Sequence, residues 1–172
     1  MYKAAGKKFT CEDLVLQVLI DFASQNELPL SITNGSGTYR PQDYNSIEDF
    51  TNDVLGHTGS SDLEKYGNTI EISKENIQSG DLLIQQSSFG SHTQLVTEVN
   101  NFWLEITQGN TEKGLIYSNY PNSQFYIGTG LNNSYFTISN GNYYSGQNNQ
   151  FYDFNKLNQF RAYSWNFNKF KR

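Results

Sequence analysis

Residues 10–23 read TCEDLVLQVLIDFA, and this stretch decides the fold. Thr10 is a favourable residue for the N-cap of a helix, and Asp13 three positions later gives a short-armed capping box. The residues that follow would make the helix apolar on nearly every side, and such a surface is wider than the apolar stripe of a surface helix. The stretch therefore predicts a buried, central helix that begins at Cys11 and ends near Asn26.

Cys11 is the single cysteine of the chain and falls in the first turn of this helix. Unpaired backbone N–H groups and the positive end of the helix dipole lie there, and both favour a thiolate over a thiol. A lone cysteine beside an apolar run is also commonly a small buried hydrophobic residue. Two hypotheses follow for Cys11: a nucleophile at the start of a buried helix, or a part of the core.

The bulk composition limits the class of protein. A length of 172 residues suits one domain, so we expect residues 1–172 to fold as a single unit. The net charge of −5 argues against a nucleic-acid partner, because binding phosphates requires a basic face. One cysteine forms no intrachain disulfide, and no apolar run approaches the roughly 18 residues that span a bilayer.

The chain divides into a helical part, residues 1–77, and a sheet part, residues 78–172. A second helix is expected over Ile47–Leu55, with Gly56 at its C-terminal end. Residues 34–41 are rich in loop-forming types. Expected strands cover residues 82–84, 92–99, 102–108, 115–118, 124–127, 135–138 and 160–167. We therefore predict an α+β fold in which the helix bearing Cys11 packs on an antiparallel sheet.

Cysteine catalysis requires a thiolate, a base within hydrogen-bond reach and a third group that orients the base. His92 opens a predicted strand, and Gln108 and Asn110 end the next one. The alternatives are a strand-edge histidine that hydrogen-bonds water, and ordinary turn residues at the other two positions. No metal site is expected, because one cysteine and two histidines offer too few ligands, and no phosphate loop or other cofactor motif is present.

The order of these features resembles the bacterial papain-like NlpC-type amidases and peptidases, and more closely their CHAP (cysteine, histidine-dependent amidohydrolase/peptidase) relatives. In that superfamily a cysteine begins a buried helix, a Gly-Asp pair leads into a strand, and a histidine starts the following strand. The resemblance implies that Cys11 is the nucleophile, that His92 is the base, and that Gln108 or Asn110 is the third group. The chain departs from the pattern with Gln108 where glutamate is usual and Thr10 where aspartate is common.

The resemblance implies a papain-like cysteine hydrolase that cleaves amide bonds in peptidoglycan peptides and uses no cofactor. No signal peptide is recognised at the N-terminus. We therefore expect an antibacterial effector or toxin domain, secreted by another route, with a cognate immunity protein as its partner. A deamidase or acyltransferase acting on host protein or lipid is the first alternative. The second is a non-catalytic glycan-binding module that uses the aromatic residues of the C-terminal half.

Overall fold

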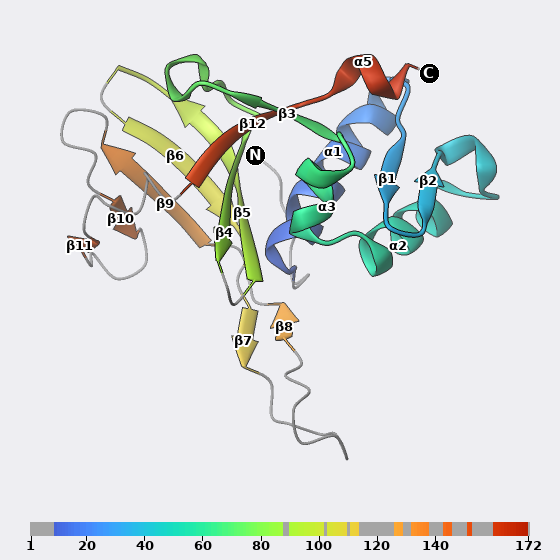
Figure 1. Ribbon diagram of the computed structural model, residues 1–172, viewed down its shortest axis with the longest axis horizontal. Coiled ribbons are helices and arrows are strands. Elements are labelled where there is room, and N and C mark those ends of the chain that lie inside the picture. The colour runs from blue at the N-terminus through green and yellow to red at the C-terminus, as the bar shows by residue number, and fades with distance from the viewer. Residues whose placement is uncertain are drawn as a thin grey trace.

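The computed structural model describes residues 9–87, 90–101, 103–109, 111–113, 126–128, 132–137, 143–145, 151–152 and 160–171. Helices gather on one side of the molecule and pack on a curved antiparallel sheet on the other side (Figure 1). The expected mixture of α and β structure is confirmed, with the N-terminal helix packed on the sheet.

The N-terminal helix α1 (Cys11–Gln25) begins where the capping pattern predicts. Thr10 Oγ1 accepts a hydrogen bond from the backbone N–H of Asp13 at 3.4 Å and so caps the helix. Its buried side chains are Cys11, Leu14, Val15, Leu16, Gln17, Leu19, Ile20 and Ala23. Phe22 is 53% exposed, so the prediction of a helix buried nearly all round is wrong for its outer side.

The rest of the helical part differs from expectation in its boundaries. The loop expected at residues 34–41 instead contains β2 (Gly37–Tyr39), which forms a hairpin with β1 (Ile32–Asn34). After a single 3-10 turn at Pro41–Asp43, α2 (Ile47–His57) runs past Gly56, which therefore lies inside the helix rather than ending it. α3 (Ser60–Lys65) follows after two residues.

One eight-stranded antiparallel sheet dominates the other part of the molecule, in the order β11-β10-β9-β6-β5-β4-β12-β3. Its strands are β3 (Thr69–Ile72), β4 (Leu82–Ser87), β5 (Gly90–Val99), β6 (Trp103–Gln108), β9 (Asn132–Thr137), β10 (Tyr143–Ser145), β11 (Phe151–Tyr152) and β12 (Phe160–Trp165). A separate pair is formed by β7 (Thr111–Lys113) and β8 (Tyr126–Gly128). β3 comes from the expected helical part, and the strand expected at 115–118 lies outside the described residues.

Alternation along β4 places hydrophobic side chains on both faces of the sheet. Leu82 and Ile84 pack with α1 in one core, whereas Leu83 packs in a second core on the other face. The turn into β4 contains Gly80, whose φ of +96° favours glycine, and Asp81, which accepts a hydrogen bond from the Gln78 N–H at 2.8 Å. The Gly-Asp pair of the sequence thus forms the turn before a strand buried on both faces.

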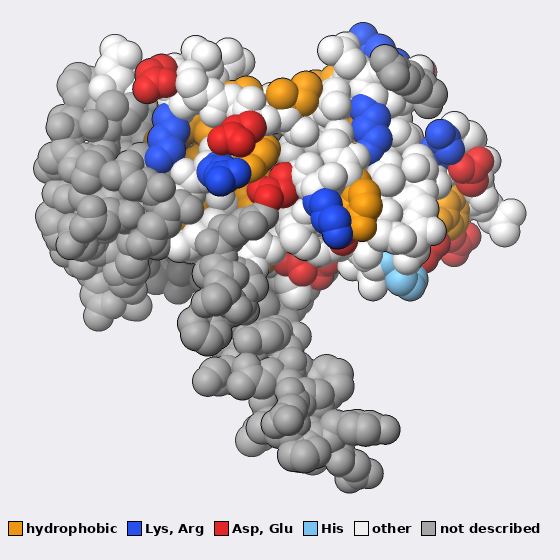
Figure 2. All heavy atoms as spheres, viewed as in Figure 1, with side chains coloured by type: hydrophobic (Ala, Val, Ile, Leu, Met, Phe, Trp, Pro, Cys, Tyr) orange, Lys and Arg blue, Asp and Glu red, His pale blue; other side chains and the backbone are white. Residues whose placement is uncertain are grey.

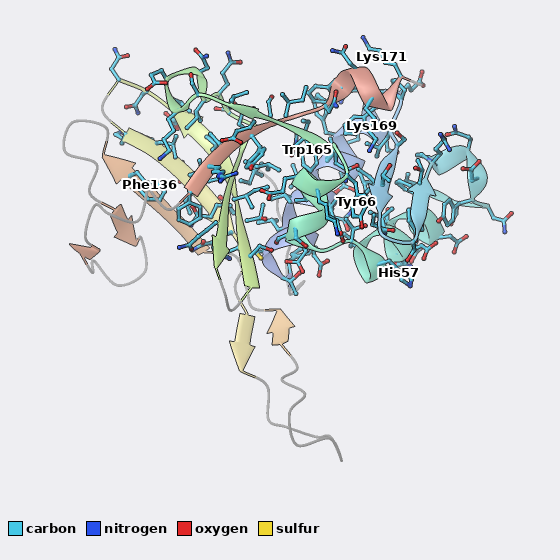
Figure 3. The ribbon with its side chains drawn as sticks, in the orientation of Figure 1. His57, Tyr66, Phe136, Trp165, Lys169 and Lys171 are labelled. Carbon is cyan, nitrogen blue, oxygen red and sulfur yellow. The ribbon has the colours of Figure 1, made fainter. Side chains whose placement is uncertain are left out.

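The C-terminal helix α5 (Phe167–Phe170) closes the helical side and is capped by Asn166. Figure 3 shows Lys169 above α3 and Tyr66, and its Nζ donates to the Tyr66 carbonyl oxygen at 2.8 Å. Because Asn166 already caps α5, β12 ends at Trp165, two residues before the expected end of that strand.

On the face drawn in Figure 2, the acidic and basic side chains of the described residues alternate and form no large patch of one sign. Among the described residues, no helix is long and apolar enough to cross a membrane.

Candidate functional site

The N-terminus of α1 meets the end of β6 through direct backbone contact. A Cβ atom added to Gly109 would overlap the carbonyl oxygen of Thr10 and lie 2.5 Å from that of Phe9. Only glycine allows the two backbones to lie so close together. The residue after Gln108 is therefore packed against the residue before Cys11.

The Cys11 side chain is 6% exposed and is surrounded by polar groups rather than by hydrocarbon alone. Its thiol donates to Glu12 Oε2 at 2.9 Å, and Sγ lies 3.5 Å from Ser60 Oγ at the start of α3. The Ser60 hydroxyl also donates to Glu12 Oε2 at 3.4 Å, and the backbone of Thr93 hydrogen-bonds the sulfur. Cys11 thus joins α1, α3 and β5 at one point.

These surroundings correct the expectation of a stabilised thiolate at Cys11. Burial raises the pKa of Cys11 to about 11, and the negative charge of Glu12 and its hydrogen bond act in the same direction. The contacts with Ser60 and with the Thr93 backbone lower the pKa but do not offset burial. At neutral pH the resting sulfur is therefore a thiol, and a base must remove its proton before it can attack.

His92 and Gln108, which we predicted to act together, do lie together. His92 Nε2 lies 2.6 Å from Gln108 Oε1. Gln94 Nε2 donates to the same Oε1 at 2.8 Å. Gln94 and Gln108 are 3% and 6% exposed, so both bonds are shielded from water.

Gln108 Oε1 can only accept, so His92 Nε2 carries the hydrogen in this arrangement. The other ring nitrogen, Nδ1, then has a lone pair and can take up a proton. Burial lowers the pKa of His92, while the hydrogen bond to Gln108 and the charge of Glu12 raise it. The ring is therefore neutral at pH 7 and able to act as a base.

The Cys11 sulfur contacts the backbone of β5 one residue along from His92, near the point where β6 ends. β6 ends at Gln108, Gly109 packs against the start of α1, and the sulfur contacts the backbone of Thr93. His92 is the residue before Thr93, and the charge of Glu12 influences the pKa of both Cys11 and His92. Within the described part of the chain, the hydrogen-bond partners of the sulfur are Glu12, Ser60 and the Thr93 backbone, not the His92 ring.

Asn110, the other candidate for the third group, lies outside the described residues.

The sequence analysis missed three polar residues of this site: Glu12, Ser60 and Gln94. Glu12 is adjacent to Cys11 and could have been considered as a neighbour in the same helical turn. Ser60 and Gln94 gave no signal, because their positions depend on how α3 and β6 pack against β5.

Glu12→Gln should make Cys11 more reactive, because it removes the negative charge beside the sulfur. Below the pKa, each unit by which the pKa falls gives about tenfold more thiolate. We expect alkylation by iodoacetamide at pH 8 to be several-fold faster, measured by mass spectrometry on a chain with one cysteine. Asp13→Asn is the matched control, since the Asp13 carboxylate hydrogen-bonds Thr10. An unchanged or slower rate in Glu12→Gln would show that Glu12 does not hold the proton on the thiol.

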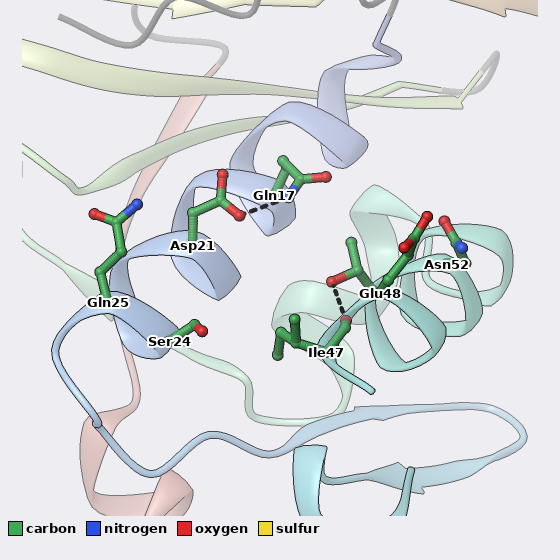
Figure 4. A pocket seen from close by; sticks show the side chains of 8 residues that line it. Gln17, Asp21, Ser24, Gln25, Ile47, Glu48 and Asn52 are labelled. Carbon is green, nitrogen blue, oxygen red and sulfur yellow. Dashed lines mark hydrogen bonds between the residues drawn. The ribbon is translucent and has the colours of Figure 1, made fainter. Parts of the chain in front are cut away.

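A hollow lies between α1 and α2, away from Cys11 (Figure 4). It has a volume of about 300 Å³ and is lined by Gln17, Asp21, Ser24, Gln25, Ile47, Glu48, Thr51 and Asn52. Gln17 Nε2 donates to Asp21 Oδ1 across its floor at 2.8 Å. None of the residues discussed as catalytic lines this hollow. No group of three metal-ligating side chains occurs in the parts of the chain that the structure describes.

Comparison with known proteins adds no assignment: no family model, no curated protein and no solved structure matches this chain.

Proposed function

We propose that this protein is a cysteine amidase or peptidase with a papain-like fold of the NlpC/CHAP type. Cys11 is the nucleophile, His92 is the general base and acid, and Gln108 orients the imidazole. The observation that carries the proposal is the 2.6 Å bond between His92 Nε2 and Gln108 Oε1. It lies on the two strands whose ends meet the N-terminus of the helix that bears Cys11.

The arrangement supports acyl transfer through a general base. His92 Nδ1 accepts the proton of the Cys11 thiol as Sγ attacks the carbonyl carbon of an amide. The backbone N–H of Cys11, in the first turn of α1, is assigned to the developing oxyanion, because the first N–H groups of a helix have no intrahelical partner. Collapse breaks the C–N bond, and the proton on His92 passes to the leaving amine. Water then attacks the thioester carbonyl and gives one proton to His92. Collapse breaks the C–S bond and releases the carboxylic acid, and the Cys11 sulfur takes the proton back from His92.

The high pKa of Cys11 makes the base indispensable to this scheme. A thiol with a pKa of about 11 has roughly one part in 10⁴ as thiolate at pH 7. The lowered pKa of His92 keeps the ring in its neutral, proton-accepting form at the same pH. We infer a neutral thiol and a neutral imidazole in the resting site rather than an ion pair.

For the substrate we propose peptidoglycan peptides, on the resemblance to NlpC-type and CHAP enzymes. Such a substrate implies action outside the producing cell, as an antibacterial effector or toxin domain with a cognate immunity protein.

Digestion of purified peptidoglycan tests both the chemistry and the substrate. The wild-type protein is expected to release a new pair of amine and carboxyl groups, detected by mass spectrometry of the muropeptides. Cys11→Ala is expected to leave the muropeptide profile unchanged. Cleavage that persists in Cys11→Ala would refute the cysteine mechanism, and unaltered muropeptides with the wild type would refute the cell-wall substrate.

A further inference from the structure

The proposed mechanism gives Gln94 no role. It is on β5, two residues after His92, so the two side chains leave the same face of the strand. Its side chain is 3% exposed, and its Nε2 donates to Gln108 Oε1 at 2.8 Å. The atom that binds His92 is therefore held from two sides.

In this orientation the side-chain oxygen of Gln94 gives up a hydrogen bond. Gln94 Oε1 is buried and has no hydrogen-bond partner among the residues that the structure describes. Leaving a buried acceptor unpaired is unfavourable, because the desolvation of that oxygen is not compensated. The amide nonetheless turns its NH₂ group, rather than its oxygen, towards Gln108.

The orientation of the Gln108 amide determines which nitrogen of His92 holds the hydrogen. With Oε1 towards the ring, His92 Nε2 must donate, and Nδ1 is left as the base. If the amide were rotated by half a turn, its NH₂ group would face Nε2. The ring hydrogen would then move to Nδ1, which could no longer accept the proton of a thiol.

We propose that Gln94 is a positioning residue, which holds the Gln108 amide with its oxygen towards His92 and so keeps the imidazole in its Nε2–H form. This inference rests on the proposed function for its purpose, but its geometry can be tested without a substrate. Gln94 acts through Gln108 and touches no reacting atom.

The test is the ¹⁵N spectrum of the His92 ring, recorded above the pH at which the imidazole titrates. The chain has two histidines, and His57 is exposed and bonds Asp53 on α2, so His57→Gln gives a background with one ring. In that background we expect the shift of Nε2 to be that of a protonated nitrogen and the shift of Nδ1 that of a bare one. The reverse pattern would overturn the proposal without any further variant.

Gln94→Glu then reverses the polarity of the network. A carboxylate at this position accepts only, so it should attract the NH₂ group of Gln108 and force that amide to rotate. The ring hydrogen is expected to move to Nδ1, with exchange of the two ¹⁵N shifts. Gln94→Met, which removes the donor and adds no acceptor, should give a partial shift in the same direction. Retention of the Nε2–H form in Gln94→Glu would overturn the proposal.

Thr93→Val is the matched control, because Thr93 is the neighbouring residue, is fully buried, and its Oγ1 bonds no group in the described parts of the chain. It should leave the tautomer unchanged, and a change there equal to that in Gln94→Glu would reduce Gln94 to a packing role. The result is independent of catalysis. A Gln94-dependent tautomer in a protein that cleaves nothing would refute the proposed function alone, and an active enzyme with an unresponsive tautomer would refute the role of Gln94 alone.

Discussion

His92→Ala should lower kcat/KM for amide cleavage by about 10³-fold or more, because it removes the proposed base, which a thiol with a pKa of about 11 requires. Gln108→Ala should cost less, about 10- to 100-fold, the range found when the outer hydrogen-bond partner of a metal-bound histidine is removed. The loss should fall on kcat rather than on KM, since neither side chain is assigned a role in holding the substrate.

The measurement is the initial rate of amine release from peptidoglycan, with the folded state of each variant checked by circular dichroism. His57→Ala is the matched control, since it removes the other histidine, which is exposed and bonded to Asp53 on α2. Equal rates in wild type and His92→Ala would rule out His92 as the base. A loss in Gln108→Ala as large as that in His92→Ala would mean that Gln108 does more than orient the ring.

Gly109→Ala should damage both stability and activity, because the added methyl group would overlap the carbonyl oxygens of Thr10 and Phe9. Both obstacles are backbone atoms, so the methyl group cannot be accommodated by a side-chain rotation. Overpacking of this kind costs about 1–3 kcal/mol of unfolding free energy, and somewhat more where backbone must shift. For a domain of this size we expect the Tm to fall by about 5–10 °C.

The rate of Gly109→Ala should fall by more than the loss of folded protein explains, because the clash separates Cys11 from the end of β6. A displacement of about 1 Å at a reacting centre can cost about 10²-fold in rate. Gly56→Ala is the matched control: it lies inside α2, and a Cβ there meets nothing within 4 Å. It should stabilise the protein by about 0.5–1 kcal/mol through helix propensity alone. An unchanged Tm and rate in Gly109→Ala would refute the close contact between α1 and β6.

The parts of the site that the sequence predicted depend on short-range interactions. Thr10 caps α1 through a bond to Asp13 three residues away, and the start of the helix at Cys11 follows from that local pattern. His92 was expected to open a strand over residues 92–99, and β5 has that end but begins two residues earlier, at Gly90. The exposure of Phe22 was not predicted, because only the tertiary packing decides which side of an apolar helix faces water.

The pairing of Gln94 with Gln108 depends on a β-bulge that the sequence does not signal. Pairing between β5 and β6 runs from Val99↔Leu104 through Glu98↔Glu105 and then shifts, so that Val96 pairs with Ile106. Counting from the hairpin turn without this shift would place Gln108 on the face opposite to His92. The extra residue, Thr97, thus turns Gln108 to the side of the sheet on which His92 lies.

The protonation of Cys11 was predicted in the wrong direction for a similar reason. A position in the first turn of a helix favours the thiolate, but burial and the Glu12 carboxylate outweigh that effect. The burial depends on how α3 and β5 cover the helix end, which cannot be read from the sequence of α1, whereas Glu12 is the next residue in the chain.

The most direct test of the central claim is to join the sulfur and the ring chemically. The reagent 1,3-dibromoacetone alkylates one nucleophile with each end, and its three-carbon bridge links only groups a few ångströms apart. After treatment at pH 8.5 and proteolysis, we expect a peptide pair joined between Cys11 and His92, and no such pair in His92→Ala. Alkylation of Cys11 without a bridge, or a bridge from Cys11 to a residue other than His92, would contradict a shared site.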